Sequence, residues 1–166
     1  MGNYINEEFE DIISPILEID EFNQLKYITH HGITRYDHSM RVAYLSYKVS
    51  KALRLNYKEV TEAALLHDFF LDEVSHETRV ERLRHHPNFA VKNASKYVEL
   101  SDMQKDIIKT HMFPITFTPP KYLESWIVDA VDDIAAVYES FYRMHHEFRT
   151  AMLLFMFLVV NFVKMR

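Results

Sequence analysis

The stretch Ala63–Leu71, with the sequence AALLHDFFL, decides the fold because it places two ionisable side chains in an otherwise apolar segment. Read as a helix, its apolar residues recur with His67 at three- and four-residue intervals, so this histidine points toward the core. Asp68 lies about 100° further round the helix and is still flanked by apolar residues. An unpaired buried carboxylate costs many kcal/mol, so we expect a cation or hydrogen-bond donors beside Asp68. For the dipeptide alone, a buried His–Asp hydrogen-bonded pair is the simplest interpretation.

Composition favours an all-α, single-domain protein. The chain has 166 residues, and its two glycines and five prolines provide few of the turn residues that a many-stranded sheet needs. We expect one helical bundle over residues 1–166, with a motif-bearing core at about 30–136 and closing helices at 137–166. The absence of cysteine excludes disulfides and thiolate metal sites, and the N-terminus shows no signal peptide, so we expect a cytoplasmic protein. A net charge of −5 argues against binding of long nucleic acids.

The C-terminal segment 151–163 is apolar except for Asn161. As a helix it spans about 20 Å, whereas the hydrocarbon core of a bilayer is about 30 Å thick. We therefore expect a buried helix that closes the core, without membrane contact. A role as the face of a homodimer stays open.

Histidines also lie on the inward faces of two other predicted helices. His38 begins a stripe in the helix expected at about 35–53, and His111 shares a face with apolar neighbours in a helix near residues 101–112. Pro87 suits the first turn of another helix, which puts His86 at or near its N-cap. The stripe that begins at His38 continues through Val42, Leu45, Val49 and Ala52. Two helices have strong N-cap candidates, Asn56 and Ser101.

Three acids lie on the helix expected at about 121–142. Asp129 is nearly opposite the apolar stripe of this helix, so we expect it to be solvated. Asp132 and Asp133 flank the stripe on its two sides, and periodicity does not choose between them. The stripe consists of Ile127, Ala130, Val131, Ile134, Tyr138 and Phe141.

The inward-facing polar residues favour one shared metal centre. Separate core histidines would each need a partner of their own, whereas one metal centre satisfies all of them. Imidazole and carboxylate ligands without thiolate suit Mn²⁺, Fe²⁺, Co²⁺, Ni²⁺ or Zn²⁺. The sequence thus predicts a divalent metal site that collects His38, His67, His111, Asp68 and either Asp132 or Asp133.

The order of His38, the His67–Asp68 pair and a distant aspartate resembles the H…HD…D signature of the HD-domain superfamily of metal-dependent phosphohydrolases. Five segments between about residues 30 and 136 are similar to small, single-domain bacterial HD proteins: HHGITRYDHSMRVA, ALLHDFF, HHPNFAVKNA, IIKTHMFPIT and ESWIVDAVDDIAA. The resemblance implies an all-α bundle that holds metal through His38, His67, Asp68 and Asp132. Many relatives have lysine at the next position, where this chain has Asp133.

The resemblance also implies a second ion. In binuclear HD proteins, the positions that match His86 and His111 bind a second metal, and the aspartate that matches Asp68 bridges the two. We expect two divalent ions, with a mononuclear site as the alternative. His85 replaces His86 as the ligand if the register is shifted by one residue.

The implied activity is hydrolysis of a phosphoester or phosphoanhydride in a small molecule or nucleotide, with a metal-activated hydroxide attacking phosphorus. Arg35 and His31 are candidates for binding the substrate. His31 and Asp72 are also candidates for positioning water or moving a proton, with Asp68 at the reacting centre. Two other classes stay open: a di-iron HD-type oxygenase and a non-catalytic HD domain that binds a ligand or regulates.

Overall fold

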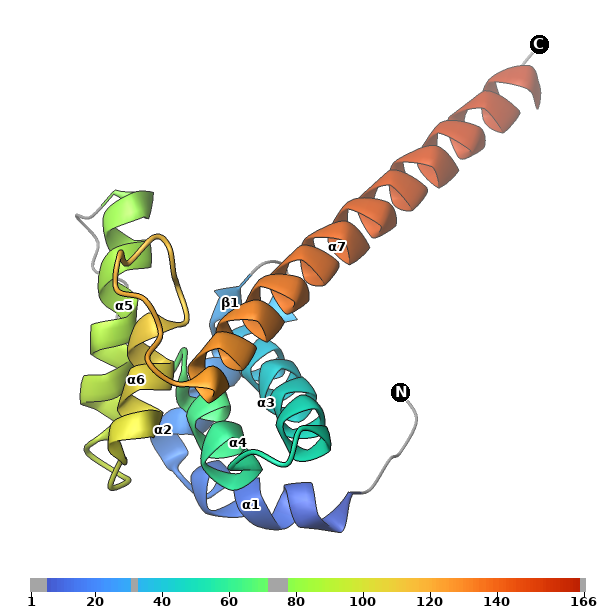
Figure 1. Ribbon diagram of the computed structural model, residues 1–166. Coiled ribbons are helices and arrows are strands. Elements are labelled where there is room, and N and C mark those ends of the chain that lie inside the picture. Colours follow the sequence, from blue (N-terminus) through green and yellow to red (C-terminus); the bar gives the residue numbers. More distant parts are fainter. Residues whose placement is uncertain (1–5, 31–32, 72–77, 165–166) are drawn as a thin grey trace.

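The computed structural model describes residues 6–30, 33–71 and 78–164, and it shows a helical bundle from which one long helix projects (Figure 1). In chain order, the elements are α1 (Glu7–Leu17), α2 (Asp20–Asn23), the 3-10 helix η1 (Gln24–Tyr27), β1 (Thr29–His30), β2 (Ile33–Thr34), α3 (Arg35–Ala52), α4 (Tyr57–Leu66), α5 (Arg79–Ala94), α6 (Asp102–Thr110) and α7 (Leu123–Lys164). The strands form a short antiparallel hairpin where a loop was expected. The prediction of an all-α fold is confirmed.

The centre of the bundle is formed by α3 and α4, and α3 also packs along α7. Asn56 caps α4, as predicted, by accepting a hydrogen bond from the Glu59 amide. The predicted inward stripe of α3 is correct for His38 and Val42, but further along the helix Leu45 and Val49 are exposed. Small and aromatic residues take the buried positions instead: Ser39, Ala43, Ser46, Tyr47 and Ser50.

The expected helix through Leu71 ends earlier, at Leu66. His67 is the C-cap of α4, and Asp68 follows it. The chain turns here because the Phe69 amide bonds the Leu66 carbonyl rather than continuing the α-helical pattern. The HD pair therefore lies at a helix end, where the last backbone carbonyls have no partner within the helix.

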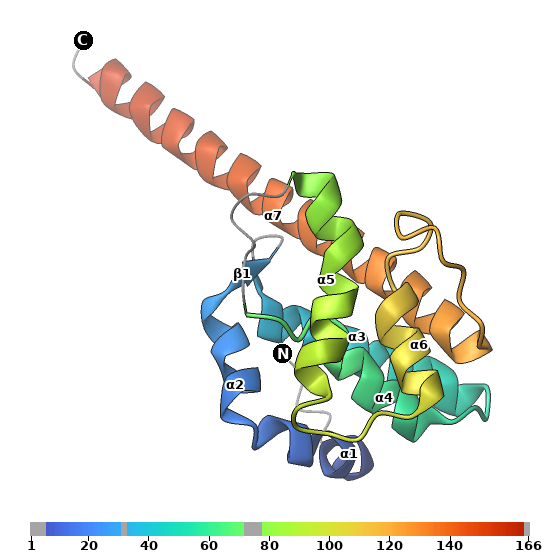
Figure 2. The same ribbon diagram turned by 90° about the vertical axis from the view of Figure 1, so that its left-hand side faces the viewer.

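Helices α5 and α6 lie side by side on one flank of the bundle (Figure 2). The prediction that a helix begins at Pro87 was wrong, because α5 begins at Arg79, two turns earlier. Thr78 and Glu81 form a capping box that starts the helix there, and Pro87 lies inside it. Ser101 caps α6 as predicted, and His111 is the C-cap of this helix.

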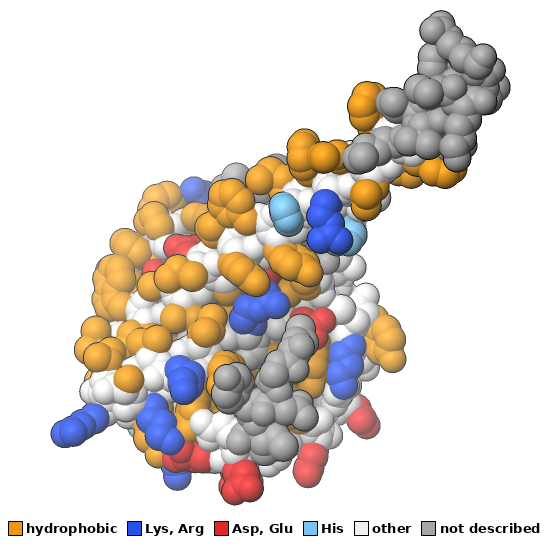
Figure 3. Space-filling view, turned by 90° about the vertical axis from the view of Figure 1, so that its right-hand side faces the viewer, with side chains coloured by type: hydrophobic (Ala, Val, Ile, Leu, Met, Phe, Trp, Pro, Cys, Tyr) orange, Lys and Arg blue, Asp and Glu red, His pale blue; other side chains and the backbone are white. Residues whose placement is uncertain are grey.

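Helix α7 is one continuous element of 42 residues. Four of the six predicted core positions are exposed, so most of the predicted stripe was wrong: Ala130, Ile134, Tyr138 and Phe141. The buried face consists of Ser125, Val128, Asp129, Val131, Asp132, Ala135 and Glu139. The prediction that the C-terminal segment forms a buried helix that closes the core was also wrong. The segment after residue 140 continues α7 away from the bundle (Figures 1 and 3). None of the helices in the described part of the chain has the apolar length that a membrane crossing requires.

Candidate metal centre

Five helices bring together six of the side chains that the sequence singled out. His38 comes from the start of α3, the His67–Asp68 pair from the end of α4, and the others from α5, α6 and α7. All are buried, with exposed fractions of 8% or less: His38, His67, Asp68, His86, His111 and Asp132. The polar residues that we expected to converge from distant parts of the chain are therefore neighbours.

The potential ligand atoms form three overlapping groups, and within each group all atoms lie within 4.8 Å of one another. The groups are His38–His67–Asp68, His67–His111–Asp132 and Asp68–His86–His111. The Oδ1 atom of Asp132 lies 2.8 Å from Nε2 of His38 and 3.5 Å from Nε2 of His67. Ligand atoms that share one ion at about 2.0–2.2 Å are themselves roughly 3 to 3.5 Å apart, so these spacings suit shared coordination.

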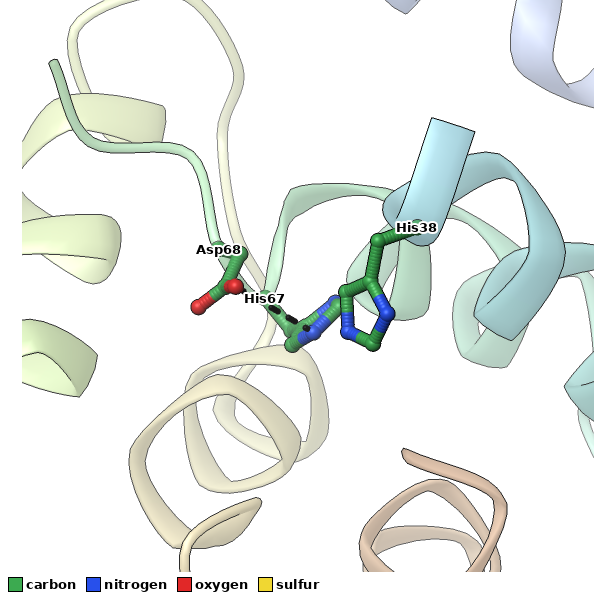
Figure 4. Close-up of side chains that lie close together, drawn as sticks. All are labelled: His38, His67 and Asp68. Atoms are coloured by element: carbon green, nitrogen blue, oxygen red, sulfur yellow. Dashed lines mark ion pairs between the residues drawn. The ribbon is translucent and has the colours of Figure 1, made fainter. Parts of the chain in front are cut away.

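Asp68 presents its two carboxylate oxygens to different histidines. Oδ2 lies 3.9 Å from Nε2 of His67, while Oδ1 lies 3.3 Å from Nε2 of His86 and 3.8 Å from Nε2 of His111. Figure 4 shows the His67 ring between this carboxylate and the ring of His38. The carboxylate therefore lies between the α3 side and the α5–α6 side of the cluster.

The backbone fixes the rings of the two C-cap histidines. Nδ1 of His67 lies 2.7 Å from the Ala64 carbonyl oxygen, and Nδ1 of His111 lies 2.7 Å from that of Ile108. A carbonyl only accepts, so each Nδ1 carries the proton and donates it. In the neutral ring, Nε2 then carries a lone pair. This is the arrangement that histidine ligands of metals usually adopt.

The Nε2 atom of His67 shows that the cluster fits a cation. It is buried and has no hydrogen-bond partner among the residues that the structure describes. Its neighbours are carboxylate oxygens, which also carry lone pairs. Buried polar atoms normally have partners, and a divalent ion between these donors would supply one.

Electrostatics in the cluster is dominated by burial and by His–Asp contacts. Burial opposes protonation of His38, but hydrogen bonds to Asp132 and Glu139 outweigh it and raise the pKa to about 10. Burial and the nearby rings of His67 and His86 lower the pKa of His111 to about 3. Burial opposes ionisation of Asp132, yet the neighbouring histidines hold its pKa below the usual range. The cluster thus combines a neutral imidazole with an ionised carboxylate.

The structure distinguishes between the alternative ligands that the sequence left open. Asp133 is exposed, whereas Asp132 lies in the cluster; likewise His85 is exposed and His86 is buried.

The expectation that Asp129 is solvated was wrong. Its side chain is buried, and its Oδ1 accepts a hydrogen bond of 3.2 Å from the Phe113 amide, a partner that helix periodicity does not reveal.

Arg35, a predicted substrate-binding residue, is not one of these six clustered side chains. Arg35 is buried; one of its guanidinium nitrogens donates to the Phe70 carbonyl at 2.6 Å, and its guanidinium lies 3.8 Å from the centre of the Phe70 ring. It thereby holds the segment that follows the HD pair, and its substrate-binding role stays a prediction. His31 and Asp72 lie outside the described residues.

Sequence reasoning missed Glu139, which is 2% exposed and contacts the cluster from α7. Its Oε2 lies 3.0 Å from Nδ1 of His38, and its Oε1 pairs with Arg41. The available signal was spacing: Glu139 follows Asp132 by seven residues, or two helical turns, and therefore shares its face. Arg41 follows His38 by three residues on the opposing helix.

The fold and the cluster together define an all-α protein with buried imidazole and carboxylate groups suited to a divalent metal. The family model of the HD domain matches residues 35–137, which is more than half of the chain. The chain therefore belongs to the HD domain family, whose members are typically metal-dependent phosphohydrolases. Comparisons with curated proteins and with solved structures gave no match.

Proposed function

We propose that this HD domain is a metal-dependent phosphohydrolase that acts on a small phosphorylated molecule or nucleotide. The observation that carries the proposal is the convergence of six buried histidine and aspartate side chains in three overlapping groups. Membership of the HD domain family supports the reaction class. The donor set of imidazole and carboxylate supports a divalent transition metal such as manganese, iron, cobalt, nickel or zinc.

The arrangement of Asp68 favours two ions over one. Its Oδ2 lies 3.9 Å from His67, which groups with His38, while its Oδ1 lies 3.3 Å from His86 and 3.8 Å from His111. Asp132 contacts both His38 and His67, and it also groups with His67 and His111. In this proposal, Asp68 bridges the two sides and therefore holds both at a fixed separation.

Charge supports an anionic substrate. When all four histidines act as metal ligands their rings are neutral, and the six side chains then carry a formal charge of −2, so one divalent ion would neutralise them and two would leave +2. When bound, divalent ions supply a water of lowered pKa and neutralise charge on phosphate oxygens. The protein's own part is to orient the ligands through the Ala64 and Ile108 carbonyls and to keep the cluster away from bulk water.

The test is metal content and hydrolysis in the same preparations. Protein purified without chelator is analysed for metal and assayed with p-nitrophenyl phosphate and bis(p-nitrophenyl) phosphate in the presence of Mn²⁺. Asp68→Ala removes the shared carboxylate, while Asp133→Ala removes an exposed acid from the same region. We expect about two ions per chain and measurable hydrolysis in the wild type and in Asp133→Ala, and loss of both in Asp68→Ala.

Other outcomes contradict either the two-ion site or the proposed reaction class. About one ion per chain with hydrolysis intact would limit the site to a mononuclear phosphohydrolase. Bound iron with oxygen consumption and no hydrolysis would favour an oxygenase. Protein that binds no Mn²⁺, Fe²⁺ or Zn²⁺ would be a non-catalytic HD domain.

A further inference from the structure

Glu139 stands just beyond the matched HD domain, two residues after it ends at residue 137. It lies on the buried face of α7 and contacts His38 on α3, which is 101 residues earlier in the chain. A buried carboxylate needs compensating partners, because desolvation of a charge is costly. Glu139 has two such partners, the His38 ring and the Arg41 guanidinium.

The position of His38 explains why a carboxylate is needed here. His67 and His111 are C-caps, and each donates its Nδ1–H to a carbonyl three residues earlier. Such carbonyls are available because they lie in the last turn of a helix. His38 lies in the first turn of α3 instead, where the nearby carbonyls accept the amides of the next turn. Its Nδ1 must therefore find an acceptor on another element.

Glu139 provides that acceptor with a defined geometry. Its Oε2 lies 3.0 Å from Nδ1 of His38, while the Nε2 atom on the other side of the ring faces Asp132 at 2.8 Å. Arg41 pairs with the remaining oxygen and so favours the ionised form of Glu139. Two turns of α7 thus place one acid at each side of the same imidazole.

We propose that Glu139 is a positioning residue for His38: it accepts the Nδ1–H and so presents the Nε2 lone pair to a metal. This inference rests on the proposed function, because it requires that His38 binds metal. A hydrogen-bonded carboxylate fixes the orientation and tautomer of a ligand histidine and raises its basicity. Arg41 supports it indirectly, through the carboxylate.

The test is Zn²⁺ affinity, measured by competition with a chromophoric chelator. Glu139→Ala removes the acceptor, and we expect about a 10- to 100-fold loss of affinity, the usual effect of removing such a partner. Glu139→Gln keeps an acceptor oxygen of the same size but not the charge, so we expect a smaller loss. Glu147→Gln is the matched control, because Glu147 is exposed on the same helix and pairs only with Arg143 among the described ion pairs.

A spectroscopic readout separates positioning from simple helix packing. In the Zn²⁺-loaded protein, the ¹H–¹⁵N spectrum of the histidine rings should show a strongly downfield His38 Nδ1–H that disappears in Glu139→Ala and shifts upfield in Glu139→Gln. If Glu139 only joined α3 to α7, its variants would unfold more easily but keep the wild-type affinity for Zn²⁺. If Glu139→Ala does not fold, the near-isosteric Glu139→Gln carries the test alone.

The two proposals fail in different ways. A wild type that binds no Zn²⁺ overturns the proposed function and this inference with it. A wild type that binds Zn²⁺, with Glu139→Gln and Glu139→Ala equal to it in affinity and in the His38 signal, overturns the role of Glu139 alone.

Discussion

The two ends of α7 differ in which side chains they bury: the first turns bury acidic residues, whereas the far end exposes apolar ones. The first five turns bury three acids, Asp129, Asp132 and Glu139, against the bundle. Beyond Glu139 the described side chains are largely exposed, although the segment 151–163 is apolar except for Asn161. Figure 3 shows apolar side chains along the surface of this projecting part. Burial in this helix follows the available partners, because the acids meet histidines, an arginine and a backbone amide, whereas the described apolar side chains at 151–155 are exposed.

The largest effect should come from a matched pair of acids at the buried end. Asp132→Ala removes an oxygen that contacts both His38 and His67, so we expect Zn²⁺ affinity to fall by more than about 100-fold. Asp133→Ala changes the next residue, whose side chain is exposed, and should alter affinity less than about twofold. Chelator competition measures both. Equal losses in the two variants would contradict the placement of Asp132 at the metal.

A second pair tests packing along the same helix. Val128 is fully buried and Val137 is 56% exposed. Val128→Ala removes two buried methyl groups and leaves a cavity, so we expect the free energy of unfolding to fall by about 2 kcal/mol. Val137→Ala should change it by less than about 0.5 kcal/mol. Urea denaturation in the presence of EDTA gives both values, and similar losses would show that the projecting side of α7 is also packed.

A third test uses the pH dependence of Asp129. Burial, followed by the charge of Asp133, raises the pKa of this carboxyl from 3.8 to about 7. Between those two values the folded protein holds a proton that the unfolded chain has lost, so the free energy of unfolding should fall as pH rises from about 4 to 7. Above pH 7 this contribution levels off.

Asp129→Asn keeps an oxygen that can accept from the Phe113 amide but has no titrating group. The difference in unfolding free energy between wild type and variant, measured by urea denaturation with EDTA, should therefore shift in favour of the variant as pH rises. A difference that does not change between pH 4 and 8 would show that Asp129 titrates normally.

Much of the site could be predicted because local patterns mark its members. The C-terminal part of α4 is apolar around His67, and the caps Asn56 and Ser101 mark two of the helix starts. The core face of α7 could not be found from hydropathy, because several buried positions on it are polar. Asp132 and Glu139 are buried with His38 as their hydrogen-bond partner. His38 lies 94 and 101 residues earlier in the chain, so no window of local sequence contains either acid together with this partner.

The smallest effect should come from the projecting end of α7. Phe148 and Leu154 are 69% and 60% exposed, so Phe148→Glu and Leu154→Glu should change the free energy of unfolding by less than about 0.5 kcal/mol and leave Zn²⁺ affinity unchanged. Urea denaturation at two protein concentrations, with sedimentation velocity beside it, provides the measurement. A larger loss that depends on protein concentration would mean that a second copy of the chain covers this face. The contrast between the two ends of α7 would then hold for the monomer alone, since association would bury the apolar end as the bundle buries the acidic one.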